Sequence, residues 1–224
     1  MKKKITAYLF LIIVFSYKIY AIETHEELIE KLEMLFPLEI HFQQTTQQNK
    51  TIEGWMILGG KGKVRTEFQP PNNLVIVGTG KWLIFHDAQY DRTTYLPMDK
   101  GILNSILNPI NLKDSREIEV TKESTKDITF YDISSKKKNY EGRLRISFSN
   151  KRNSEILEWK ITDRNKNNTN VKVKKINRLK LKEIENVPFF SFTEDMRNSK
   201  NAFLGPYKKR ELKKIPKSGR PGDY

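Results

Sequence analysis

The fold is decided by residues 54–97, which run GWMILGGKGKVRTEFQPPNNLVIVGTGKWLIFHDAQYDRTTYLP. Short apolar stretches are separated there by glycine, proline and asparagine turns, which is typical of an antiparallel meander. The run Gly59–Gly62 is rich in glycine but no helical pattern follows it, so we interpret it as a hairpin turn and not as a phosphate-binding loop. The strands predicted around this stretch are Ile52–Leu58, Lys63–Gln69, Leu74–Gly78, Lys81–His86 and Arg92–Leu96.

The same pattern continues on both sides of this stretch. Leu38, Ile40 and Phe42 alternate with polar residues, which predicts a strand with one dry face and one wet face. Helical periodicity is confined to residues 26–36, ended by Pro37, and residues 98–107, ended by Pro109. The sequence therefore predicts a mainly β protein built on a curved antiparallel sheet or barrel. The further predicted strands are Glu117–Thr121, Ile128–Ile133, Tyr140–Ser149, Glu155–Thr162, Asn170–Asn177, Leu179–Ile184 and Phe189–Phe192.

The two ends of the chain differ from its middle. Lys2, Lys3 and Lys4 precede a short apolar run and Ala21, which together predict a secretory signal peptide over residues 1–21. Lys18 and Ile19 depart from the usual cleavage pattern, so an uncleaved anchor is the alternative. A single domain is expected over residues 22–199. Residues 200–224 are rich in lysine, proline and glycine, so we expect a basic, disordered tail.

Composition excludes several kinds of site. The chain has no cysteine, so it carries neither a disulfide nor the lipid anchor of a bacterial lipoprotein. Its three histidines, His25, His41 and His86, have no metal-ligand spacing. No nucleophile motif or phosphate loop is present. We therefore predict no catalytic residues, no metal and no cofactor, and an enzyme is the least supported class of function.

The order of the central segments resembles the LolA family of outer-membrane lipoprotein carrier proteins. A glycine opens an apolar strand at Gly54, a strand with a central arginine follows at Arg65, and the turn Pro70-Pro71 leads to an apolar strand. A Gly-Lys hairpin at Gly80-Lys81 then precedes an aromatic strand ending at Asp87. The similarity spans roughly residues 25 to 195. In place of the Lys-Arg-Pro turn of that family, this chain has Gly59-Gly60-Lys61, so the arginine that holds the lid in the family is absent.

The resemblance implies an unclosed β-barrel with an α-helical lid, and a periplasmic protein that binds the acyl chains of lipoproteins. Arg65 and Lys61 are the expected contacts between lid and turn, although a lysine cannot reproduce the bidentate geometry of an arginine. The implied partners are lipoproteins, an ATP-driven lipoprotein-releasing complex of the inner membrane and an outer-membrane acceptor, with the carrier as a monomer that binds no nucleic acid. The predicted lipid-binding residues, drawn from strands and the lid, are Trp55, Ile57, Phe68, Ile76, Leu83, Phe85, Ile102, Leu103 and Ile106.

Three alternatives remain open at this stage. The formal net charge of +14 favours polyanions or anionic membrane surfaces, so the charge itself could be the function. A lipoprotein sensor of the same fold is a second alternative. Finally, the same apolar residues would fill the core of any small barrel, and alternation alone does not say which face of a strand lines a cavity.

Overall fold

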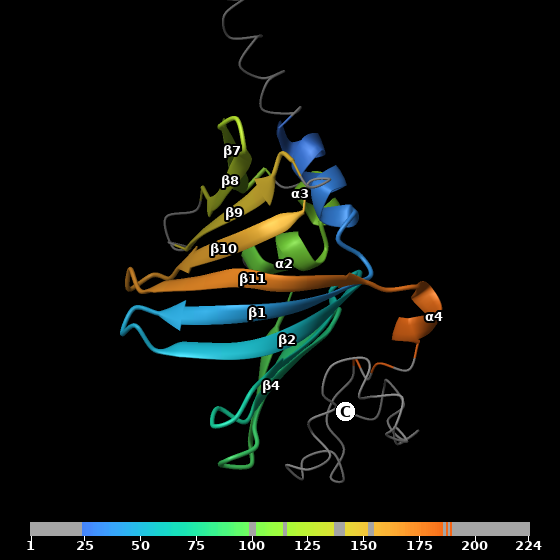
Figure 1. The fold of residues 1–224 in the computed structure, drawn as a ribbon, viewed down its shortest axis with the longest axis vertical. Coiled ribbons are helices and arrows are strands. Elements are labelled where there is room, and N and C mark those ends of the chain that lie inside the picture. Colours follow the sequence, from blue (N-terminus) through green and yellow to red (C-terminus); the bar gives the residue numbers. More distant parts are fainter. Residues whose placement is uncertain are drawn as a thin grey trace, which may run out of the picture.

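A computed structural model describes residues 24–98, 102–113, 116–136, 142–151, 155–185, 187 and 189. The predicted signal peptide (1–21) and basic tail (200–224) lie outside these residues, so both remain predictions. The described chain forms one sheet of eleven antiparallel strands in the order β6-β5-β4-β3-β2-β1-β11-β10-β9-β8-β7 (Figure 1). In the described part of the chain β6 and β7 are the two edges and do not pair with each other. The prediction of a mainly β, unclosed sheet is therefore confirmed.

The strands follow the alternation of the sequence closely. In the first half of the sheet they are β1 (Leu38–Thr46), β2 (Thr51–Gly60), β3 (Lys63–Phe68), β4 (Leu74–Thr79), β5 (Trp82–Asp87) and β6 (Arg92–Pro97). In the second half they are β7 (Ile118–Ser124), β8 (Ile128–Ser135), β9 (Arg143–Ser149), β10 (Ile156–Thr162) and β11 (Asn168–Arg178). Strands β1 and β11, from opposite ends of the domain, pair in the middle and join the two halves.

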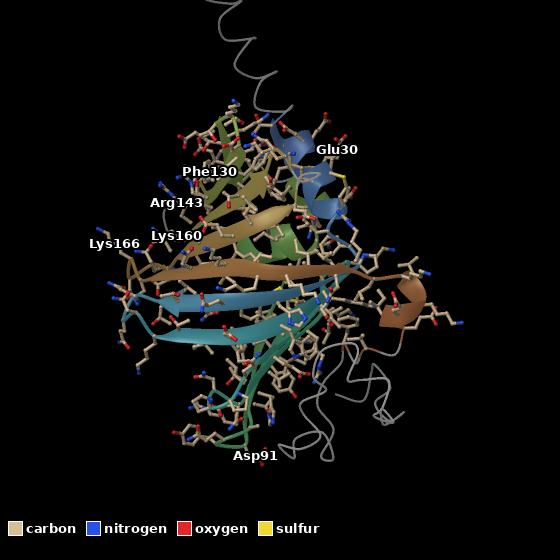
Figure 2. All side chains as sticks on the ribbon, in the orientation of Figure 1. Glu30, Asp91, Phe130, Arg143, Lys160 and Lys166 are labelled. Atoms are coloured by element: carbon tan, nitrogen blue, oxygen red, sulfur yellow. The ribbon has the colours of Figure 1, made fainter. Side chains whose placement is uncertain are left out.

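Four helical segments accompany the sheet. The first helix spans residues 24–33, and α2 (Ile102–Leu107), α3 (Ile110–Lys113) and α4 (Leu181–Ile184) follow. Leu28, Leu32 and Leu35 of the N-terminal segment and Leu112 of α3 lie in the main core together with apolar residues from strands β1 to β3 and β7 to β11. The sheet therefore curls around these helices, which cover one of its faces (Figures 1 and 2).

Two predictions about local structure need correction. The predicted strand Leu179–Ile184 is wrong, because α4 begins at Leu181. Strand β11 stops at Arg178, opposite Leu38, so no residue of β1 is left to pair with, and the Glu183 carboxylate accepts a hydrogen bond from the Lys180 amide as the helix begins. Phe189 is not in a strand, and residues 190–192 lie outside the described chain.

The second helical region also differs in detail. Helix α2 begins at Ile102, later than predicted, and residues 99–101 before it lie outside the described chain. Pro109 ends α2 as predicted, but the chain then forms the short helix α3. A proline suits the position just before a helix because its amide would have no partner there.

Candidate functional site

The strand register assigns each side chain to one of two faces of the sheet. Cross-strand neighbours share a face, and Leu38, Ile40 and Phe42 of β1 belong to the core that also holds the first helix and α3. We call this the inner face and the opposite one the outer face. Strand β2 places Leu58 and Met56 opposite Leu38 and Ile40, so these residues are also on the inner face.

The predicted lipid-binding residues divide between the two faces. Phe68 lies opposite Gly54, the partner of Phe42, and the same face carries Ile76 and Phe85. Leu83 is on the inner face too. It pairs with Gly78, which pairs with Val64, and Val64 pairs with the inner-face residue Leu58. Trp55 and Ile57 point the other way, into an outer-face cluster with Val187, Leu179, Ile184 and Phe189. The structure thus brings four of the six strand residues together and separates two from them.

Helix α2 crosses the inner face from one half of the sheet to the other. Ile102 and Ile106 pack against the main core, whereas the side chain of Leu103 lies outside the described residues. Near the start of α2, the Cδ1 methyl of Ile102 lies 3.8 Å from the position that a Cβ on Gly142 would occupy. Gly142 directly precedes β9. At the end of α2, the Leu107 carbonyl accepts a hydrogen bond from the Gly62 amide at 2.8 Å. The helix therefore spans the mouth of the curled sheet, as a lid would.

The helices cover the inner face unevenly. On β8 and β9, Tyr131, Ile133 and Phe148 are completely buried at 0% exposure. On β4 and β5 the inner-face side chains are only partly buried, although the outer-face residues Val75, Val77 and Ile84 between them are at 0%. An apolar surface with incomplete cover therefore lies beside α2. We call it the apolar strip, and its residues are Leu74, Ile76, Leu83 and Phe85.

The hairpin at Gly59–Gly62, predicted from its glycines, is confirmed and contacts the lid. Gly62 has a φ of +77°, and a Cβ there would lie 2.8 Å from the Gly80 Cα. Only glycine allows the two hairpins to approach this closely while the Gly62 amide reaches Leu107. Sequence reasoning assigned the turn contact to Lys61, whose side chain is exposed, and missed the backbone amide of Gly62. The signal in the sequence was Gly62, the third glycine of the run, which directly follows the lysine.

Arg65, the other predicted lid contact, lies on the outer face, away from α2. Its Nε donates to the Glu67 carboxylate at 2.9 Å, and both side chains are buried. Burial lowers the pKa of the Arg65 guanidinium from its ordinary value, while the Glu67 carboxylate opposes that change. Removal of either side chain of such a pair lowers stability strongly, because the other charge stays buried and loses its salt bridge. We therefore interpret the Arg65–Glu67 pair as a contact that stabilises strand β3 and not as a contact of the lid.

The described residues offer neither a metal site nor a membrane-spanning helix. No group of three or more histidine, aspartate or glutamate side chains in them is placed to hold a metal ion. Nor does any helix in that part of the chain have the length and apolar character needed to cross a membrane. Charged side chains of the described sheet form ion pairs such as those of Arg145 with Asp132 and Glu123.

One family model and several solved structures are similar to this chain. The family model for the outer membrane lipoprotein carrier protein LolA matches residues 35–184. A search of curated proteins found no match. Among solved structures, an uncharacterized conserved protein from Thermus thermophilus is 12% identical, with 71% of this chain and 90% of that chain covered and a TM-score of 0.43. A LolA superfamily protein from Nitrosomonas europaea is 10% identical, with 77% and 98% covered and a TM-score of 0.38.

Proposed function

The chain belongs to the LolA family of outer membrane lipoprotein carrier proteins, and on that basis we propose that it carries the acyl chains of lipoproteins released from the inner membrane to the outer membrane. The observation that supports this most directly is the apolar strip beside α2. Four large apolar side chains there are only partly covered, although the strand residues between them are fully buried. Such a surface suits an apolar ligand that enters when α2 moves aside.

We assign the acyl-binding surface to the inner-face members of the predicted set. Each methylene that leaves water contributes roughly 0.8 kcal/mol, so about ten buried methylenes correspond to a micromolar dissociation constant. Trp55 and Ile57 are left out of this surface because their outer-face cluster already packs them. The proposed acyl-binding residues are Phe68, Ile76, Leu83, Phe85, Ile102 and Ile106, and Leu103 stays a prediction from the sequence.

The remaining parts of the proposal concern place and partners. Proteins of this family are periplasmic, and we propose the same location for this chain after removal of residues 1–21. We further propose that a monomer takes its cargo from an ATP-driven complex of the inner membrane and passes it to an outer-membrane acceptor. Affinity at the acceptor then has to exceed affinity for the carrier, which favours incomplete burial of the acyl chain.

The test is displacement of an environment-sensitive fluorescent fatty acid from the purified mature chain by a triacylated lipoprotein without detergent. Saturable displacement that persists in high salt is expected. Phe85→Ser should weaken it, whereas Trp82→Ser, a matched change at an exposed outer-face site on the same strand, should not. Binding that disappears with salt would instead favour the polyanion-binding alternative, since surface electrostatics are screened by ions.

A further inference from the structure

The two edges of the sheet are built differently. Edge strands offer unpaired backbone groups to other chains, and proteins usually protect them with charged residues or cover. Strand β7 has three charged residues, Glu119, Lys122 and Glu123, and Lys122 is tied to Glu27 of the first helix. Strand β6 has one charged residue, Arg92, at its first position. Its residues Thr93 to Leu96 are uncharged, and threonine and tyrosine favour strands, so β6 is protected only by Arg92 at its start and Pro97 at its end.

The hydrogen-bond pattern identifies which backbone groups of β6 point away from the sheet. The Met98 amide donates to the Lys81 carbonyl at 2.8 Å, in register with the β5–β6 ladder. Because hydrogen-bonded pairs alternate along an antiparallel ladder, Leu96 and Thr94 also bond to β5. Thr93 and Tyr95 therefore direct both their N–H and C=O groups outward. Within the described residues β6 pairs with β5 alone, so these groups are available for a further strand.

The free edge adjoins the apolar strip. Leu96 lies opposite Leu83, so its side chain is on the inner face, and it is 47% exposed. An acyl chain on the strip would have Leu83 and Leu96 at its border. The polypeptide attached to that acyl chain would then leave the strip beside the outward amides of Thr93 and Tyr95.

We propose that the β6 edge pairs with an extended, uncharged stretch of the cargo polypeptide next to its acylated residue. This inference rests on the proposed function and adds a second contact to it, by addition of a strand to the sheet. The absence of charge from Thr93 to Pro97 favours an uncharged partner segment. Because Pro97 has no N–H, the ladder is short and ends there.

The size of the edge favours a tethered peptide over a second copy of the chain. Six residues of strand extend about 20 Å and present a surface about 10 Å wide. Two such edges would bury far less than the roughly 1,200 Å² at the lower limit of stable interfaces. A peptide held nearby by its acyl chain does not need that area, because its local concentration is already high.

The experiment compares two synthetic ligands on the full mature chain. One is diacylglyceryl cysteine amide, and the other carries the same lipid followed by a seven-residue Ser/Thr/Val extension. The extension should tighten binding about tenfold, as expected for a small number of net backbone hydrogen bonds. Tyr95→Pro, which removes one outward N–H at an edge, should abolish this gain and leave the affinity for the lipid alone unchanged. Tyr95→Thr, which keeps the N–H, should retain the gain.

Amide exchange provides a second measurement that does not depend on the variants. The Thr93 and Tyr95 amides should become protected by the extended ligand and not by the lipid alone. Lipid binding with no gain from the extension on the unaltered chain would overturn this inference and leave the proposed function standing. Failure of both ligands to bind would overturn the proposed function as well. A dimer that Tyr95→Pro dissociates would overturn the inference in favour of self-pairing.

Discussion

The assignment of the two faces can be tested by removing one side chain from each. Ile57 and Leu83 were both predicted to bind lipid, but the register puts Ile57 on the outer face and Leu83 on the inner face. Ile57→Ala should lower the free energy of unfolding strongly and leave acyl affinity unchanged. Leu83→Ala should lower the free energy of unfolding only slightly and weaken acyl affinity, because its side chain is only partly covered.

The expected magnitudes follow from burial. Ile57 is at 0% exposure among Trp55, Val187 and their neighbours, so Ile57→Ala removes three fully buried carbons. At about 0.8 kcal/mol per carbon plus a cavity contribution, the loss of stability is about 3–4 kcal/mol. Leu83→Ala removes as many carbons from a partly exposed site, and a loss of about 1 kcal/mol is expected. If the acyl chain contacts Leu83, the same change weakens binding about fivefold.

The assay pairs two measurements on each protein. Urea unfolding followed by tryptophan fluorescence gives the stability, and fatty-acid displacement well below the unfolding midpoint gives the affinity. Ile57→Val is the control for the outer face, with an expected loss of about 1 kcal/mol. A folded Ile57→Ala protein with weakened acyl affinity would refute the face assignment. So would a Leu83→Ala protein that loses as much stability as Ile57→Ala.

Three further predictions concern the lid, the first helix and the chain ends. Gly62→Ala should lower the free energy of unfolding by about 1–3 kcal/mol and speed amide exchange across α2. The reason is that a Cβ 2.8 Å from the Gly80 Cα displaces the amide that bonds Leu107. Unchanged exchange would mean that this hydrogen bond does not hold the lid in place. Partial burial raises the pKa of the Glu27 carboxyl, but hydrogen bonding and charge, from Lys122 above all, outweigh it and hold the pKa below its ordinary 4.5. The Glu27–Lys122 pair therefore stabilises the fold at neutral pH, and this contribution is lost as the pH falls through the lowered pKa. The difference in stability from Glu27→Gln, under about 1 kcal/mol, should close once the pH is below that pKa; a difference that persists in strong acid would contradict this sign. Mass spectrometry of the exported protein should show cleavage after Ala21, and deletion of residues 200–224 should remove salt-sensitive binding to anionic vesicles while fatty-acid displacement remains.

Much of the fold was predictable because each strand carries its own alternation and its own turn residues. Leu38, Ile40 and Phe42 define a strand without knowledge of any neighbour. The face of the sheet that each side chain occupies was less predictable where both faces of a strand are apolar, as at Leu74–Val77. There a two-residue period cannot tell the inner face from the outer, and only the register supplies the answer. For this reason Trp55 and Phe68 were predicted to share one lipid-binding surface, although they lie on opposite faces of the sheet.

The features that sequence reasoning missed depend on distant parts of the chain. Leu179 and Leu181 alternate with lysines as a strand would, but β1 begins at Leu38, and the pairing ends with the hydrogen bond from the Leu179 amide to the Pro37 carbonyl. The hydrogen bond from Gly62 to Leu107 joins two segments that are far apart in the sequence. A backbone amide has no signature of its own in a sequence, although the glycine that permits the close approach does.

The uneven cover of the inner face is what a reversible carrier requires. A fully open apolar face would hold several long acyl chains with tens of kcal/mol, at roughly 0.8 kcal/mol per methylene, and no acceptor could remove them. Because α2 already packs Ile102 and Ile106 against that face, the proposed cargo would have to replace contacts that the protein makes with itself. The net affinity is then the difference between two apolar contacts, and it can be small even when the cargo is large. The outer face, with its fully buried valines and the Arg65–Glu67 pair, would keep the sheet intact if α2 moved aside as the proposed function requires.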